Sequence, residues 1–275
     1  MWLLRGHLQA LKEAYLILLR HRQLTLEMAR REVSDRYVGQ AFGVIWAVAH
    51  PIFMMGLYVF IFAFVFKTRI GNTVEMPLDY TTYLLSGLLA WMGFQETMAK
   101  SCTAITGNAA LVKQVVFPLE ILPVKGVIVS VFQQGILTAL LVLYVLATNG
   151  KLPWTYFLLP ILFTLQAIAM MGIAYLLAAV GTYFRDMKDF IQLFVTAGVY
   201  LLPIFYLPSW VPSLFKPLLY INPFSYLIWC YQDVLYFGRI EHPWAWAVNT
   251  AVSLMVFVLG YRLFRRLKPT FGNIL

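Results

Sequence analysis

The 275 residues are 61% hydrophobic and only 12% charged, whereas soluble domains carry about 25% charged residues. This composition excludes an ordinary soluble protein and predicts an integral membrane protein with little soluble mass. The net charge of +9 arises from 21 basic and 12 acidic side chains, and their positions along the chain carry the information on topology.

Residues 7–33 are predicted to form an amphipathic helix, because Leu and Tyr side chains recur at helical spacing with basic side chains between them. Such a helix can pack on another protein or lie in the membrane interface. We favour the interface, since a membrane span follows and the charges are largely basic.

The first predicted span covers residues 38–66, which contain no Lys, Arg, Asp or Glu. A helix of this length reaches about 43 Å, more than the roughly 30 Å of bilayer hydrocarbon. In lipid the backbone must satisfy its own hydrogen bonds, so the run is expected to be a helix that crosses the membrane.

Five further charge-poor stretches predict spans at residues 80–95 (extendable to 99), 126–150, 152–184, 190–206 and 244–261. Pro203, Pro208 and Pro212 interrupt the apolar run that begins at residue 190. Because proline removes a backbone donor and clashes one turn back, short broken helices are expected after the fifth span. Non-helical backbone at membrane depth requires cover by protein or water.

Six crossings place both termini on one side of the membrane. Sixteen basic residues fall in the termini and in the second and fourth loops, and five fall in the other loops. The positive-inside rule therefore predicts cytoplasmic termini. Cys102 and Cys230 then lie on opposite sides, so a disulfide between them is not expected.

Motifs of several enzyme classes are absent from the sequence. It contains no GxxxxGK[ST] phosphate loop, no HExxH and no GxSxG, so no ATP site or hydrolase centre is expected on this chain. Acidic and basic side chains are almost missing from the predicted spans, which argues against an ion-coupled transporter.

Five stretches in register resemble one family, the permeases of type 2 ABC exporters, and within it the exporters of lipid-linked polysaccharides such as O-antigen, capsule and teichoic acid. They are RYVGQAFGVIWAVAHP (36–51), LVKQVVFPLEILPV (111–124), YFRDMKDF (183–190), LLPIFY (201–206) and NPFSYLIWCYQDVLYFG (222–238). The family usually has a basic residue where Gln232 stands, so no role is transferred to that position.

The resemblance implies an all-α membrane protein with six transmembrane helices, preceded by an amphipathic interface helix. Short re-entrant helices between spans five and six would occupy about residues 207–235. The expected division is a cytoplasmic N-terminal region (1–37), a six-span domain (38–261) and a basic cytoplasmic tail (262–275).

The resemblance also implies a non-enzymatic homodimer in the bacterial inner membrane, with a channel between its subunits. Two copies of a separate ABC ATPase would bind ATP and Mg, and this chain would need no cofactor of its own. A lipid-linked polysaccharide is the implied substrate, and no nucleic acid is involved.

Three groups of residues are candidates for function. Contact with the ATPase is expected at Val115, Phe117, Pro118, Glu120, Arg185 and Asp186, although an ordinary interface helix also explains the first four. The lipid diphosphate is expected near Arg30, Arg31 and Arg36, which the positive-inside rule explains equally well. Channel-lining aromatics are expected among Trp46, Tyr58, Trp91 and Tyr206, against the alternatives of packing and an interfacial aromatic belt.

Two other functions fit the sequence less well. A type 2 ABC permease for a drug or small lipid would need only a lateral groove rather than a continuous lane for sugars. A membrane-embedded glycan-modifying enzyme would need paired carboxylates, and the outer loops carry Glu75, Asp79, Asp233 and Glu241 in no paired spacing.

Overall fold

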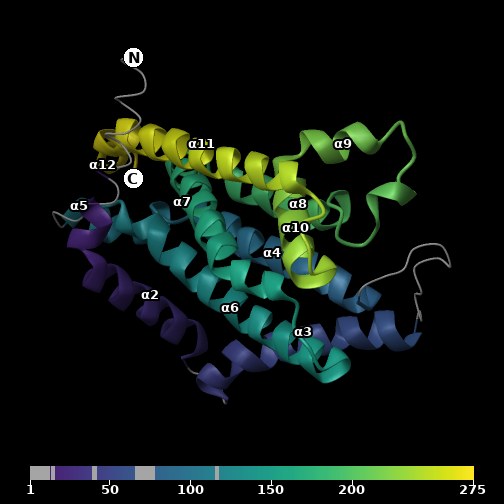
Figure 1. The fold of residues 1–275 in the computed structure, drawn as a ribbon. Coiled ribbons are helices and arrows are strands. Elements are labelled where there is room, and N and C mark those ends of the chain that lie inside the picture. Colours follow the sequence, from purple (N-terminus) through teal and green to yellow (C-terminus); the bar gives the residue numbers. More distant parts are fainter. Residues whose placement is uncertain (1–12, 14–15, 39–41, 66–77, 115–117) are drawn as a thin grey trace.

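The computed structural model describes residues 13, 16–38, 42–65, 78–114 and 118–275 (Figure 1). Within these ranges all regular structure is helical, which confirms the predicted all-α class. The first half contains α2 (Arg22–Tyr37), η1 (Gly43–Ile45), α3 (Trp46–Val59), η2 (Phe60–Val65), α4 (Tyr80–Ser101), η3 (Thr106–Asn108), α5 (Ala109–Gln114) and α6 (Ile121–Asn149). The second half contains η4 (Trp154–Leu158), α7 (Leu159–Tyr183), α8 (Met187–Leu201), η5 (Pro208–Trp210), α9 (Lys216–Ile221), α10 (Pro223–Gln232), η6 (Asp233–Phe237), α11 (Pro243–Leu267), η7 (Lys268–Thr270) and α12 (Phe271–Ile274).

Three of the predicted spans are helices long and apolar enough to cross a membrane. They are Ile121–Asn149, Trp154–Tyr183 and Pro243–Ile274. The first of them ends where Gly150 adopts a left-handed conformation (φ +69°) and donates its N–H to Leu146 O. Only glycine adopts this backbone conformation without steric cost, so the end of α6 is encoded locally.

The other three predicted spans correspond to shorter or less apolar helices. The run 38–66 is not one straight helix, because Gly43 has φ +51° and a 3-10 turn there separates α2 from α3. Helix α3 begins at Trp46, and the π-helical segment η2 follows it from Phe60. Helix α4 matches the second predicted span, and twelve residues of α8 (190–201) fall within the fifth. Six crossings stay a prediction.

Long helices lie side by side and define two opposite ends of the molecule. Helix α7 packs along α11, α4 contacts both α6 and α7, and α2 lies along α6 (Figure 1). The short helices α5 and α12 contact each other at one end of the bundle, whereas α9 lies at the opposite end.

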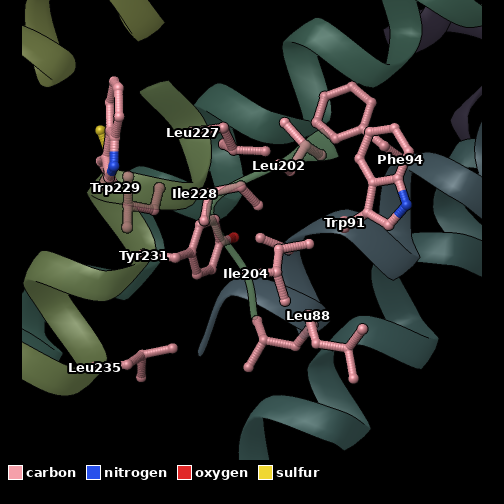
Figure 2. Close-up of a cluster of buried hydrophobic side chains, with 14 of the residues drawn as sticks. Leu88, Trp91, Phe94, Leu202, Ile204, Leu227, Ile228, Trp229, Tyr231 and Leu235 are labelled. Atoms are coloured by element: carbon pink, nitrogen blue, oxygen red, sulfur yellow. The ribbon is translucent and has the colours of Figure 1, made fainter. Parts of the chain in front are cut away.

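Of the broken helices expected after the fifth span, α10 and η6 belong to the core, whereas η5 and most of α9 are not buried. Helix α8 ends at Leu201, before Pro203, and α10 begins where the Asn222 side chain accepts a hydrogen bond from Phe224 N (3.1 Å). Helix α10 contacts α4 and α11, and its residues Ile228 and Tyr231 are completely buried (Figure 2). Protein therefore covers α10 on several sides, which is what a short helix at membrane depth would require.

Candidate functional site

Those of the residues predicted to contact an ATPase that the structure describes lie at the end of the bundle formed by α5 and α12. Val115 and Phe117 fall outside the described residues. Pro118 is half-buried just before α6, and Arg185 and Asp186 are exposed in the turn between α7 and α8. The Tyr183 hydroxyl hydrogen-bonds to the Thr270 hydroxyl, which places this turn beside the C-terminal segment.

Glu120 has a partner within the chain. Its side chain is about 5% exposed, and both carboxylate oxygens accept hydrogen bonds from Lys268 Nζ at 2.6 and 2.9 Å. The Lys268 side chain is 34% exposed, so the pair is buried on the carboxylate side only, and removal of Lys268 would destabilise the protein by leaving the buried Glu120 charge uncompensated. Any role of Glu120 in ATPase contact therefore operates through Lys268 rather than through an exposed carboxylate.

The C-terminal segment is packed against the candidate contact region. Helix α11 continues past Tyr261 to Leu267, and the chain then folds back through η7 into α12. Phe271 is completely buried against Phe264 in a cluster that also contains Leu119 and Leu122. The segment 262–275, expected as a basic tail, thus joins the ends of α6, α7 and α11 into one unit.

The basic residues predicted to meet a lipid diphosphate lie on α2. Arg30 and Arg31 are exposed, and Arg31 Nε lies 3.8 Å from Asp35 of the same helix. The side chain of Arg36 is outside the described residues. Arg30 and Arg31 thus lie at the surface, where Asp35 accompanies Arg31, and a contact of these residues with a lipid diphosphate stays a prediction.

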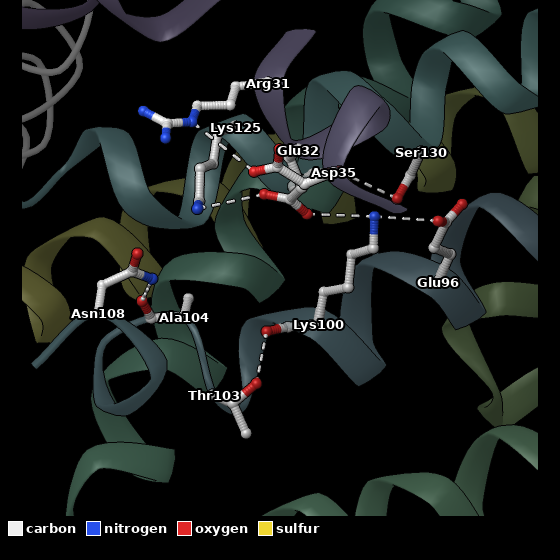
Figure 3. A network of polar contacts seen from close by, with 11 residues as sticks. Arg31, Glu32, Asp35, Glu96, Lys100, Thr103, Ala104, Asn108, Lys125 and Ser130 are labelled. Atoms are coloured by element: carbon white, nitrogen blue, oxygen red, sulfur yellow. Dashed lines mark hydrogen bonds and ion pairs between the residues drawn. The ribbon is translucent and has the colours of Figure 1, made fainter. Parts of the chain in front are cut away.

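A second basic cluster beside α2 was not predicted. Lys100, near the end of α4, and Lys125, in the first turns of α6, both pair with Glu32 of α2 at 3.2 and 3.3 Å (Figure 3). Lys100 also lies 3.1 Å from Glu96. Both lysines sit at the ends of neighbouring predicted spans, on the same membrane side, and this sequence signal could have identified them.

The four candidate channel aromatics occupy different environments. Trp46 is 40% exposed at the start of α3, and Tyr58 is half-buried near the end of that helix. Tyr206 is half-buried and donates its hydroxyl to Leu201 O (3.0 Å). Trp91 is completely buried, donates Nε1–H to Val195 O (3.2 Å) and packs against Phe224, so it offers no surface to a passing polymer.

One buried polar cluster was not predicted from the sequence. Gln134 of α6 donates its side-chain amide to both Gln166 Oε1 (2.8 Å) and Tyr231 Oη (3.0 Å), which ties α6, α7 and α10 together. Polar side chains that bond across helices hold membrane bundles together, at a gain of about 1 kcal/mol or less each.

The buried carboxylate of Asp233, the first residue of η6, fixes the link between η6 and α11. It accepts hydrogen bonds from the His242 backbone N–H and from Trp246 Nε1, both at 3.1 Å, and lies 2.8 Å from His242 Nδ1.

A family model described as ABC-2 type transporter matches residues 23–236, which is most of the chain. The chain belongs to the ABC-2 type transporter family. The resemblance noted in the sequence is thereby confirmed. An ABC-2 transporter chain of this kind is a membrane-embedded permease of an ABC transporter.

Curated relatives of this ABC-2 transporter chain cover nearly its whole length. It is 26% identical over 254 residues to an O-antigen export system permease protein RfbA of Klebsiella pneumoniae, covering 92% of this chain and 95% of the relative. It is 26% identical over 259 residues to a protein of the same name from Myxococcus xanthus, covering 93% and 96%.

Proposed function

We propose that this chain is the membrane-spanning subunit of an ABC transporter that exports a lipid-linked polysaccharide across the bacterial inner membrane. The observation that carries the proposal is the near full-length similarity to permeases named for O-antigen export. ATP and Mg would be bound by two copies of a separate ABC ATPase subunit, and two copies of this chain would form the channel.

The proposed topology has six crossings and cytoplasmic termini. Two facts support it: the excess of basic residues in the termini and in the second and fourth loops, and the contact of α5 with α12 at one end of the bundle. Lys113 of α5 would then lie inside the cell and Lys216 of α9 outside. A cysteine at position 216 that reacts only from the cytoplasm would contradict this arrangement.

The ATPase is proposed to push on this chain at the end of the bundle formed by α5 and α12. Helix α5 and the exposed turn at Arg185 and Asp186 would receive the closing motion of the ATPase. The Glu120–Lys268 pair and the buried Phe271 connect this end to α6 and α11. Motion applied there would thus reach two long helices directly.

Aromatic side chains are proposed to guide the polymer. Sugar hydroxyl groups cost several kcal/mol each when they enter hydrocarbon unpaired, so a polymer must move through protein. Aromatic faces offer contact without a fixed register. Trp46, Tyr58 and Tyr206 keep exposed surface for this purpose, whereas the burial of Trp91 supports a packing role.

Export by cells that lack their own copy of the permease tests this function. The parental chain is expected to restore polymer at the cell surface. Alanine at Trp46, Tyr58 or Tyr206 is expected to reduce surface polymer about twofold to twelvefold, since an aromatic contact contributes about 0.5–1.5 kcal/mol. Phenylalanine at the same positions should retain most export.

Trp91→Ala serves as the packing control in this experiment and should lower the amount of protein in the membrane instead. Parental export by all three alanine variants would remove the aromatic lane and favour a drug or small lipid as substrate.

A further inference from the structure

A cavity of about 670 Å³ lies between α2, the end of α4 and the beginning of α6. Its charged lining comprises Arg31, Glu32, Asp35, Lys100 and Lys125. Leu24, Met28 and Leu111 add apolar surface to the same cavity. The cavity therefore combines cationic groups with an apolar wall, as a lipid head group and the start of its tail would require.

The two lysines in this cavity are held together by a single carboxylate. Glu32 Oε1 lies 3.2 Å from Lys100 Nζ, and Glu32 Oε2 lies 3.3 Å from Lys125 Nζ (Figure 3). Each oxygen thus serves one ammonium group. The side chains of Glu32 and the two lysines are 17–25% exposed, so the cluster is shielded but reachable.

A phosphate group would satisfy these lysines better than the carboxylate does. It offers more oxygens and more negative charge, and lysine binds phosphate as a point charge without fixed geometry. Lys100 Nζ also lies 3.1 Å from the Glu96 carboxylate, which partly neutralises its charge. An anion that replaces Glu32 would therefore be attracted mainly by Lys125.

We propose that Lys100 and Lys125 form the binding site for the diphosphate of the lipid-linked substrate, and that Glu32 occupies this site when substrate is absent. This inference rests on the proposed export function. Substrate binding would displace Glu32 and release α2 from its ion pairs with α4 and α6. Substrate occupancy would thereby change how α2 is held against the bundle.

Binding of farnesyl diphosphate to the full-length protein in phosphatidylcholine nanodiscs tests the proposal. Glu32→Gln is expected to tighten binding about fivefold, because a charge near the membrane surface contributes about 1 kcal/mol. Lys125→Gln is expected to weaken binding by a similar factor. Glu27→Gln changes the same net charge at an exposed position of α2 and should leave binding unchanged.

The sign of the Glu32→Gln effect separates this proposal from a purely structural role. If Glu32 only ties α2 to the bundle, its replacement loosens the site, and diphosphate binding weakens or stays the same. Either result overturns the proposal. If Glu32→Gln fails to fold, Lys125→Gln decides instead, and unchanged diphosphate binding by that variant overturns the proposal.

The lipid source is tested with farnesol and with nanodiscs that contain phosphatidylglycerol. Farnesol, which lacks the diphosphate, should not bind at this site. Phosphatidylglycerol should not abolish the tighter binding of farnesyl diphosphate that Glu32→Gln produces. Full competition by phosphatidylglycerol would assign the site to bulk anionic lipid and overturn the diphosphate assignment. Polymer export by cells is followed in parallel. If the variants do not change diphosphate binding as expected but the parental chain exports polymer, this inference is rejected and the proposed function stands.

Discussion

Replacing Gly172 of α7 by valine is expected to prevent accumulation of folded protein. A Cβ atom at Gly172 would lie 2.5 Å from the backbone of Phe257 in α11, and one at Gly260 would lie 2.0 Å from the carbonyl oxygen of Gly172. The two backbones thus touch, and small residues at such crossings are what allow membrane helices to approach this closely. Overpacking typically costs about 1–3 kcal/mol, and here backbone rather than a flexible side chain would have to move.

The measurement is the amount of monodisperse protein extracted from membranes, together with its thermal unfolding temperature. Gly135→Val is the matched control, since a Cβ at Gly135 of α6 meets no atom within 4 Å. The control should behave as the parental chain. Parental yield and unfolding temperature for Gly172→Val would show that α7 and α11 do not cross as described.

Glu120→Lys is expected to uncouple the ATPase from export and to destabilise the C-terminal segment. The change places two ammonium groups where Glu120 and Lys268 now pair at 2.6 Å, in a site where the carboxylate is almost completely buried. Breaking a fully buried pair costs about 3–5 kcal/mol, and the cost here is expected to be smaller because the Lys268 side chain is 34% exposed. The consequence is loss of the packed arrangement of η7 and α12 against the beginning of α6.

The exchange variant Glu120→Lys with Lys268→Glu should recover part of the loss, because it restores one pair of opposite charges. Co-purification of the ATPase, ATP-dependent export and thermal unfolding are the three readouts. Arg266→Glu is a control that reverses one charge, in the opposite sense, at an exposed position of the same segment, and it should be close to parental. If the exchange variant is as impaired as Glu120→Lys alone, the pairing is not what matters at this site.

Features that depend on local sequence were predicted well. The long apolar helices α6, α7 and α11 follow from charge-free runs, and the break after α8 follows from Pro203. Contact across distant segments was not predictable in the same way. The partner of Glu120 lies at Lys268, and Gln134 meets Tyr231, because tertiary packing brings helices together that no periodicity links.

Trp91 illustrates a second limit of sequence reasoning. A tryptophan inside an apolar helix suits a belt, a channel wall or a core equally well, since its ring is apolar and its N–H polar. Which of these three environments the ring occupies depends on the helix that packs against it. Here Gly198 of α8 leaves the space for the ring, because a Cβ at Gly198 would lie 2.3 Å from a ring atom of Trp91.

ATP-driven movement of polymer in proteoliposomes tests the central claim most directly. The chain is reconstituted with its ATPase, lipid-linked polysaccharide is supplied on the ATPase side, and a glycosidase enclosed in the lumen reports polymer that has crossed. We predict glycan cleavage that requires ATP, Mg and this chain together. Absence of cleavage in vesicles whose ATPase is active and assembled with the chain would contradict polysaccharide export.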